Sequence, residues 1–362
     1  MIRNRVIRLG LIAGLLFTTG CGDEYTTRVQ VFPDGSVVRE VVLEDKNQKA
    51  PDDWWPFAVG SDWPATTTKT EKLNQGKKEV VYLHSVSRRF ASGRQLRSEM
   101  ESLPRDGSVL APQVELTRRW RGFFFTFSYR EAYPILPMFQ RVPAGEFFAP
   151  AELDLVRLLI YDEVTAKQRY AKDEIDRVEG KFLQWQMRCE FEEIFHFLSG
   201  LAAKGVDPNL TTAMLREKRE PLWQALQAEE DPSLAMHLKR FAEILPAELL
   251  DSLRQRAAQE FQALEMRFRL VEDHILDSFH LQVSLPGLIT ATNSTAVKGS
   301  RVSWDVPLLA FCFFGKEMTV ESRCLNWWAV GGAAFLLCLL LLGLFIAAWR
   351  RKAMTSSSAS RP

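Results

Sequence analysis

The sequence lacks every short motif that usually locates a catalytic or cofactor site. It contains no HExxH, GxSxG, SxxK or CxxC pattern and no glycine pattern of the Walker or Rossmann type. Histidine is scarce, with five residues in the chain, and His84, His237 and His274 have no zinc-ligand spacing around them. We therefore predict no enzyme activity, no cofactor and no metal site. A hydrolase with dispersed catalytic residues remains an alternative, because such residues assemble in space rather than in sequence.

An excess of basic charge is missing as well. Seven of the 46 Lys and Arg residues lie in residues 1–21 and 350–362, which contain no acid, so the remaining chain has 39 basic residues against 45 acidic ones. Nucleic-acid binding calls for a basic face, and broad adhesion to anionic lipid calls for clustered basic residues. The charge balance therefore predicts no nucleic-acid partner and no general electrostatic adhesion to membranes.

Cysteine is infrequent, with five residues in the chain. Residues 308–324 look like a hairpin turning at Gly315-Lys316. In that hairpin Cys324 would lie about 17 Å from Cys312, beyond disulfide reach. We expect Cys189, Cys312 and Cys324 to be free thiols in the folded protein.

The N-terminus is basic and then apolar. Arg3, Arg5 and Arg8 precede the uncharged run 9–17, which is shorter than the roughly 20 residues that a membrane-spanning helix needs. A basic start, a short apolar core and small residues before a cleavage site are typical of a secretory signal peptide. We therefore predict a signal peptide over residues 1–20.

The end of this segment carries a resemblance to a known family. The residues Thr18-Thr19-Gly20-Cys21 resemble the lipobox of bacterial lipoproteins. The resemblance implies cleavage before Cys21 and acylation of that cysteine, which becomes the first residue of the mature chain. Gly20 and Thr19 fit the pattern, whereas Thr18 stands where the family favours Leu. An ordinary secretory signal or an uncleaved anchor is the alternative.

The C-terminal segment 327–349 contains no charged residue and is long enough to cross a bilayer as one helix. Tryptophans at its ends suit the membrane interface, and the basic residues that come next favour the cytoplasmic side. We expect residues 21–326 to lie on the outer side of the cytoplasmic membrane of a bacterium, with the lipid bilayer as a partner. The predicted membrane-interface anchors are Trp327, Trp328, Trp349, Arg350, Arg351 and Lys352.

Strand patterns occupy the first part of the exported chain. Two β-branched runs within residues 25–44 flank the turn Pro33-Asp34-Gly35-Ser36. Further strands are predicted around 79–86, 114–120 and 123–129. Residues 45–77 read as a polar, turn-rich segment.

Helical patterns begin at about residue 150. Apolar residues recur at steps of three and four from Ala171 to Cys189 and again from Leu250 to Ile275, which predicts two long amphipathic helices packed as an antiparallel pair. Asp207-Pro208 and Asp231-Pro232 each read as the start of a short connecting helix.

Strand alternation returns over residues 281–285 and 301–306. The stretch 285–306 resembles β-rich domains of bacterial lipoproteins that end in a membrane helix. We predict an α+β fold in which a β-rich extracytoplasmic domain is interrupted by a helical insertion. The predicted divisions are a signal peptide 1–20, β-rich parts 21–149 and 277–326, a helical insertion 150–276, a transmembrane helix 327–349 and a cytoplasmic basic tail 350–362.

One pair of residues has the spacing of a di-iron ligand motif. Glu193 and His196 form a Glu-x-x-His, but such a site needs a second copy and two further glutamates. The nearest partner, Asp277 with His280, has the wrong acid. We interpret the pair as a chance feature of a charged helix.

Aromatic residues gather in two places. Trp54, Trp55 and Trp63 are able to stack on sugar rings, but we favour a loop that buries them on the sheet. Phe123 to Phe127 include four phenylalanines, which either line an apolar cavity or belong to the core.

The sequence leaves three hypotheses for function. The first is a membrane-anchored envelope lipoprotein that binds or scaffolds an envelope protein through the helical insertion. The second is a protein that binds lipid or another apolar ligand beneath the insertion. The third is the envelope hydrolase with an unrecognised site.

Overall fold

The computed structural model describes residues 24–45, 56–57, 59–60, 62–74, 77–227, 233–246, 248–275 and 277–358. Its strands are β1 (Glu24–Val31), β2 (Val37–Asp45), β3 (Ala65–Asn74), β4 (Lys77–Phe90), β5 (Gln113–Arg121), β6 (Phe124–Tyr133), β7 (Ser278–Ser284), β8 (Leu288–Thr292), β9 (Ala296–Lys298), β10 (Arg301–Pro307) and β11 (Lys316–Leu325). Its helices are α2 (Gly93–Ser102), α3 (Pro137–Gln140), α4 (Ala144–Phe147), α5 (Pro150–Tyr161), α6 (Glu163–Arg169), α7 (Lys172–Ala203), α8 (Thr212–Gln227), α9 (Leu234–Ala242), α10 (Leu249–Arg256), α11 (Ala258–His274), α12 (Ala310–Phe313) and α13 (Trp327–Ser358).

The described strands form two sheets that face each other. One sheet has the order β3-β4-β2-β1-β7-β10-β9, and the other has the order β5-β6-β11-β8. The pairing of β1 with β7 is parallel, so strands from before and after the helices meet in one sheet. The chain is therefore an α+β protein in which the helical segment is an insertion into a β-domain, as the sequence predicts.

Two glycines make the close turns at one end of the sheets. Gly35 adopts a φ of 92° in the predicted turn between β1 and β2, where Asp34 accepts a hydrogen bond from the backbone of Ser36 at 2.9 Å. Gly287 has a φ of 85°, and a Cβ there would lie 2.1 Å from the carbonyl oxygen of Arg323. A side chain at position 287 would thus push the β7–β8 turn away from β11.

The helical insertion is built on α7 and α11, which run antiparallel. Two ion pairs show the direction: Lys204 pairs with Glu260 at 3.2 Å, whereas Glu193, earlier in the chain, pairs with the later residue Arg267 at 3.0 Å. The second predicted helix is not continuous, because Ala257 leaves helical geometry (φ −125°, ψ 43°) and separates α10 from α11. The apolar stripe continues across this break, which is why periodicity alone misses it.

The predicted helix starts are displaced. Asp207 caps no helix but accepts a hydrogen bond from the backbone of Asn209 at 2.9 Å, and α8 begins at Thr212. Asp231-Pro232 lies outside the described residues, and the N-cap of α9 is Ser233. Both aspartates precede a proline, a pairing that suits a turn as well as a helix start.

The junction between the insertion and the β-domain is aromatic. Phe313 of α12 stacks on Trp185 of α7 with ring centroids 4.5 Å apart, and Phe182 and Phe148 lie within 6 Å of the same ring. The predicted hairpin over 308–324 is wrong, because its apolar first half forms α12 and only its second half is a strand, paired with β6 and β8. In a short apolar run that is buried on all sides, hydrophobic periodicity cannot distinguish a strand from a helix.

One strand lies where the sequence predicts only turns. Residues Ala65–Asn74 form β3 at the edge of the larger sheet, paired with β4. Its residues between Ala65 and Leu73 are threonine, lysine and glutamate, and most are exposed. A strand with two polar faces has no apolar alternation, so its β-branched threonines are the main signal for it.

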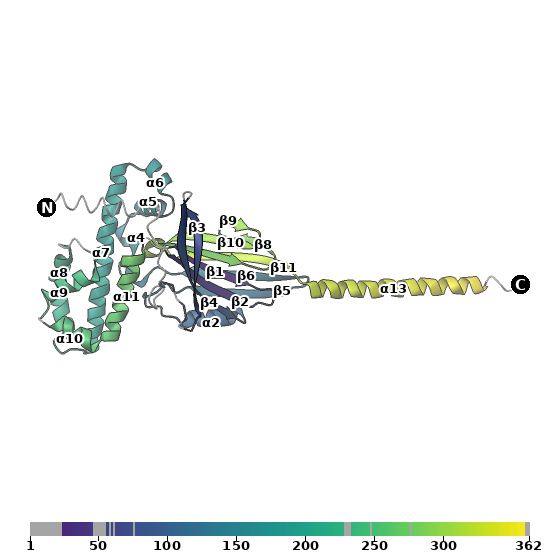
Figure 1. Ribbon diagram of the computed structural model, residues 1–362, viewed down its shortest axis with the longest axis horizontal. Coiled ribbons are helices and arrows are strands. Elements are labelled where there is room, and N and C mark those ends of the chain that lie inside the picture. The colour runs from purple at the N-terminus through teal and green to yellow at the C-terminus, as the bar shows by residue number, and fades with distance from the viewer. Residues whose placement is uncertain are drawn as a thin grey trace.

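Helix α13 projects from the end of the molecule opposite the helical insertion (Figure 1). Its segment Trp327–Ala347 has a mean hydropathy of 2.6 and none of it is buried, so by length and composition this helix could span a membrane. The helix continues to Ser358, past the predicted end at Trp349. In the described structure the apolar segment therefore stands clear of the β-domain.

The strands also fix which residues lie at each end. Leu325, at the end of β11, comes just before α13. The β7–β8 turn lies beside it, because Ser322 donates a hydrogen bond to the Pro286 carbonyl at 2.8 Å. Val31 is at the same end, because β1 runs parallel to β7. Glu24, in contrast, lies opposite Ser278, which comes after α11. The first described residue is therefore at the end of the β-domain that faces the helical insertion.

Candidate functional site

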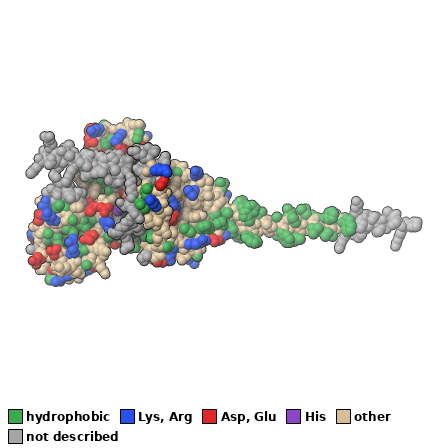
Figure 2. Space-filling model, in the orientation of Figure 1, with side chains coloured by type: hydrophobic (Ala, Val, Ile, Leu, Met, Phe, Trp, Pro, Cys, Tyr) green, Lys and Arg blue, Asp and Glu red, His purple; other side chains and the backbone are tan. Residues whose placement is uncertain are grey.

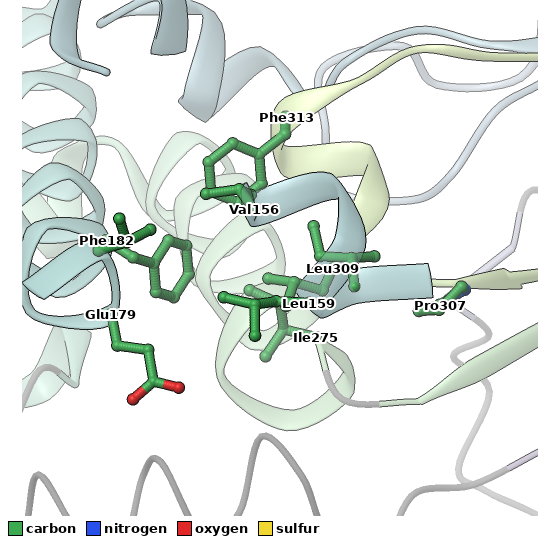
Figure 3. A pocket seen from close by; sticks show the side chains of 10 residues that line it. Val156, Leu159, Glu179, Phe182, Ile275, Pro307, Leu309 and Phe313 are labelled. Carbon is green, nitrogen blue, oxygen red and sulfur yellow. The ribbon is translucent and has the colours of Figure 1, made fainter. Parts of the chain in front are cut away.

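An apolar cleft of about 100 Å³ lies where the insertion meets the β-domain (Figure 3). Helix α5 contributes Val156, Leu159 and Ile160 to its wall, and α7 contributes Val178, Glu179 and Phe182. The remaining lining residues are Ile275, which follows α11, and three residues from the end of β10 to the end of α12, namely Pro307, Leu309 and Phe313. The cleft thus exists only because four segments far apart in sequence converge there.

The local sequence explains how each wall of the cleft is formed. Helix α5 starts at Pro150, whose fixed φ suits a first helical position, and the backbone of Ala149 donates to the Glu152 carboxylate at 2.8 Å. Val178 and Phe182 are one turn apart on α7, so both side chains face the same way. Phe313 is held in place by its stack on Trp185.

Glu179 is the one ionisable residue in the lining. Burial raises the pKa of its carboxyl group, and the nearby Asp176 charge raises that pKa further. Figure 3 shows the carboxylate beside the apolar side chains rather than among them. This arrangement favours an apolar occupant and offers a single acceptor at the edge.

The size of the cleft limits what fits. Pockets for small molecules usually measure about 300–1,000 Å³, whereas an apolar cavity of roughly 150 Å³ holds a benzene ring. A volume near 100 Å³ accepts one apolar side chain or the end of an acyl chain. It does not enclose a whole lipid.

Glu193 and His196, interpreted from the sequence as a chance Glu-x-x-His pair, lie on α7 away from Asp277 and His280. Glu193 is buried and forms ion pairs with Arg141 at 2.9 Å and Arg267 at 3.0 Å. His280 instead lies on β7, where its ring meets Asp305 and Glu24. Within the described residues, no group of three or more His, Cys, Asp or Glu side chains is arranged to hold a metal ion.

The aromatic predictions have mixed outcomes. Trp63 is buried against Phe90, and its ring nitrogen donates to Glu99 at 3.1 Å, so it is not available for stacking on a sugar. Trp54 and Trp55 lie outside the described residues.

The phenylalanine-rich strand does not line the apolar cleft. Phe127 is fully buried in the core and Phe125 is half-buried, whereas Phe123 and Phe124 are exposed at the end of the sheet near α13. Of these four phenylalanines, Phe124 borders a separate, polar hollow on the outer face of the sheet. The residues that line the cleft have no sequence pattern that marks them as a binding site. Each is an apolar or helix-surface residue that packing in the core explains equally well.

The remaining predicted sites concern the termini. Cys21 lies outside the described residues, as do the side chains of Arg350, Arg351 and Lys352. Trp327, Trp328 and Trp349 lie on α13 with their side chains exposed. The predicted lipidation and the predicted basic anchors therefore stay predictions.

The thiols of the folded part are free. Cys189, Cys312 and Cys324 are all unpaired, as the sequence predicts, although the hairpin used to predict this does not exist. Burial raises the pKa of the Cys189 and Cys312 thiols, so both are protonated at neutral pH.

No family model matches the chain, and no curated protein matches it. Among solved structures, the folded domain of LppM from Mycobacterium tuberculosis, determined by NMR, aligns with 10% sequence identity and a TM-score of 0.27. The alignment covers 86% of this chain and 94% of that chain. A TM-score this low carries no argument about fold or function, so function has to be inferred from the residues of this chain.

Proposed function

We propose that this chain is a membrane-anchored envelope lipoprotein that works as a binding or scaffolding module. The observation that carries the proposal is α13, whose apolar segment Trp327–Ala347 is uncovered and leaves the β-domain opposite the helical insertion. An exposed apolar surface of this size needs a bilayer in place of water. With α13 in the membrane, the insertion and its cleft face away from the point of attachment.

Orientation and lipidation belong to the same proposal. Arg350, Arg351 and Lys352 favour a cytoplasmic C-terminus by the positive-inside rule, which leaves residues 21–326 outside. Acylated Cys21 adds a second attachment. The mass of the N-terminal peptide from membrane-extracted protein, beside a Cys21→Ser control, tests this part: a diacylated or triacylated cysteine supports it, and an unmodified chain contradicts it.

The partner in this proposal is an envelope protein that places one apolar side chain in the cleft. A photo-crosslinking residue at Leu159, which lines the cleft, is expected to capture one specific protein in intact cells. The matched control is the same residue at Val164, which is 68% exposed on neighbouring α6. Identical products from both positions would contradict a partner at the cleft.

A second candidate function is binding of an apolar ligand. The apolar lining of the cleft favours this function, and the cleft volume of about 100 Å³ limits the size of the ligand. Mass spectrometry of lipids that stay with the purified full chain tests it. A lipid lost on Leu159→Glu and kept on Val164→Glu would favour this candidate over a protein partner. The hydrolase stays a prediction from the sequence alone.

A further inference from the structure

The outer face of the four-stranded sheet carries a polar hollow of about 470 Å³. The hollow lies at the end of the sheet from which α13 departs. Six of its lining residues are arginines or hydroxyl side chains, namely Thr117, Arg119, Arg121, Thr126, Ser128 and Arg323.

Strand pairing arranges these side chains in rows across the sheet. Arg119 on β5 and Arg323 on β11 both lie opposite Thr126 of β6, so two guanidinium groups flank one hydroxyl. The next row, further from α13, places Ser128 between Thr117 and Glu321. A site with two arginines and a hydroxyl in one row is thus built by register and not by a loop.

The arginines of the hollow form no ion pair within the described residues. Arg130, further along the same face, pairs with Glu317 at 2.6 Å. Within the described part of the chain, Arg119, Arg121 and Arg323 form no ion pair and no hydrogen bond to a side chain, and all three are exposed. Glu321 is the one acid in the lining. The hollow therefore presents a net positive charge that its own fold leaves unmatched.

The hollow adjoins the proposed membrane surface. Leu325, the last residue of β11, lies opposite Phe124, and the backbone of Asn326 donates to the Phe123 carbonyl at 2.8 Å just before α13 begins. Large apolar side chains are exposed around this point, including Trp120 (68%), Leu288 (72%) and Trp328 (91%). Figure 2 shows hydrophobic side chains along α13 and on the adjoining end of the β-domain.

Depth in the bilayer can be derived from the strand spacing. The row of Arg119 and Arg323 is two residues from the end of β11, which is about 7 Å at roughly 3.4 Å per residue. The polar layer of a bilayer is about 5–7 Å thick on each side of the hydrocarbon. With Trp327 and Trp328 at the interface and the strands continuing the line of α13 out of the membrane (Figure 1), the two guanidinium groups lie at the level of the lipid phosphates.

We infer that this hollow binds the phosphate of an anionic phospholipid in the outer leaflet of the membrane that holds α13. The inference rests on the proposed function, because the hollow meets lipid only when α13 is in the bilayer. Guanidinium groups bind phosphate oxygens through paired hydrogen bonds, and the hydroxyl of Thr126 adds a donor. Glu321 repels the phosphate and restricts it to the two rows nearest α13.

The test is native mass spectrometry of the full-length protein in detergent, titrated with phosphatidylglycerol or with phosphatidylcholine. Wild-type protein is expected to bind phosphatidylglycerol about tenfold more tightly, because phosphatidylcholine has the same phosphate but also a quaternary ammonium group that the arginines repel. The double variant Arg119→Gln and Arg323→Gln loses this preference. Glu321→Gln strengthens phosphatidylglycerol binding severalfold, a gain that misfolding does not produce.

The matched control changes the same charge elsewhere. Arg169 and Arg216 are exposed on α6 and α8, far from α13, and their double replacement by Gln is expected to leave both affinities unchanged. Equal affinities for the two lipids in wild type, or an equal loss in the control, would overturn the inference. So would inorganic phosphate that displaces the lipid at equal concentration, because the site would then take a free anion.

The same samples separate this inference from the proposed function. Protein that stays in membranes after an alkaline wash, yet does not distinguish the two lipids, refutes the inference and leaves the anchoring intact. Protein that is released by the wash refutes the anchoring itself.

Discussion

Arg39 and Glu131 form the most completely buried ion pair in the described chain, with side chains 1% and 0% exposed. Two hydrogen bonds of 2.9 and 2.8 Å join them across the space between the two sheets, and the hydroxyls of Tyr129 and Tyr133 donate to the same carboxylate. Burial raises the pKa of Glu131, but the charge and hydrogen bonds of Arg39 outweigh it, so the pKa is below its ordinary value. The pair is therefore charged at neutral pH and fixes how the sheets align.

We predict that Glu131→Gln destabilises the protein by about 3–5 kcal/mol, because it leaves a buried guanidinium without a counter-charge. The free energy of unfolding from urea titration of the full chain in detergent measures this. The double variant Arg39→Met and Glu131→Met recovers most of the loss, since neither charge remains. A double variant as unstable as Glu131→Gln would contradict the explanation.

The same pair predicts a pH dependence. A carboxyl group whose pKa is lower in the folded chain contributes stability above its unfolded pKa of about 4.3. That contribution is lost as pH falls through the lower, folded value. Below pH 4 the difference in unfolding free energy between wild type and the double methionine variant is expected to shift in favour of the variant. A difference that does not change with pH would show that the pKa of Glu131 is the same in the folded and the unfolded chain.

Glu179 behaves in the opposite way, because burial raises the pKa of its carboxyl group in the folded chain. A raised carboxyl pKa costs stability at neutral pH and costs nothing once the group is protonated in both states. We predict that Glu179→Gln raises the melting temperature by about 1 °C at pH 7 and leaves it unchanged at pH 3.5. Scanning calorimetry at the two pH values measures this, and a gain of equal size at both would refute it.

Helices and strands with a clear hydrophobic periodicity are predictable from this sequence, whereas helix breaks, short helices and the cleft are not. The β1–β2 hairpin and the long helix α7 are expected from β-branched runs, a Pro-Asp-Gly turn and a stripe at helical spacing. The break at Ala257 and the short helix α12 leave no such pattern, because both are decided by what packs around them. The same limit applies to the cleft, which combines residues from four segments.

The aromatic junction between α7 and α12 decides whether the insertion folds together with the β-domain. Phe313 is 5% exposed and contacts the rings of Trp185, Phe182 and Phe148. We predict that Phe313→Ala costs about 3–5 kcal/mol and speeds hydrogen exchange in both α7 and the strands. Hydrogen-exchange mass spectrometry of the full chain reads out the two parts separately.

The matched control is the next residue. Phe314 is only partly buried and contacts the guanidinium of Arg157 with 4.7 Å between the group and the ring centroid. Phe314→Ala is therefore expected to cost about 1 kcal/mol or less and to leave exchange in α7 slow. Faster exchange confined to the helices in Phe313→Ala would show that the insertion is an independent folding unit.

At the scale of the whole molecule, the first described residue and the start of α13 lie at opposite ends of the β-domain. Helix α13 leaves beside the β7–β8 turn, whereas Glu24 lies beside Ser278 at the end that faces the insertion. Strand β1 has eight residues, which is about 26 Å. The three residues from Cys21 to Glu24 reach at most about 11 Å. An acylated Cys21 and α13 therefore share one bilayer only if the β-domain tilts from the bilayer normal toward the membrane surface.

This geometry predicts that removing the lipid raises the domain from the membrane. Neutron reflectometry of the full chain in a supported bilayer is expected to show a protein layer about 15 Å thicker for Cys21→Ser than for wild type, from the difference between strand length and chain reach. Cys338→Ser is the matched control, because that cysteine lies on α13 and is expected to leave the layer unchanged. Equal thickness for Cys21→Ser and wild type would mean that position 21 does not hold the domain down, and α13 would then be the attachment that sets how the cleft is presented.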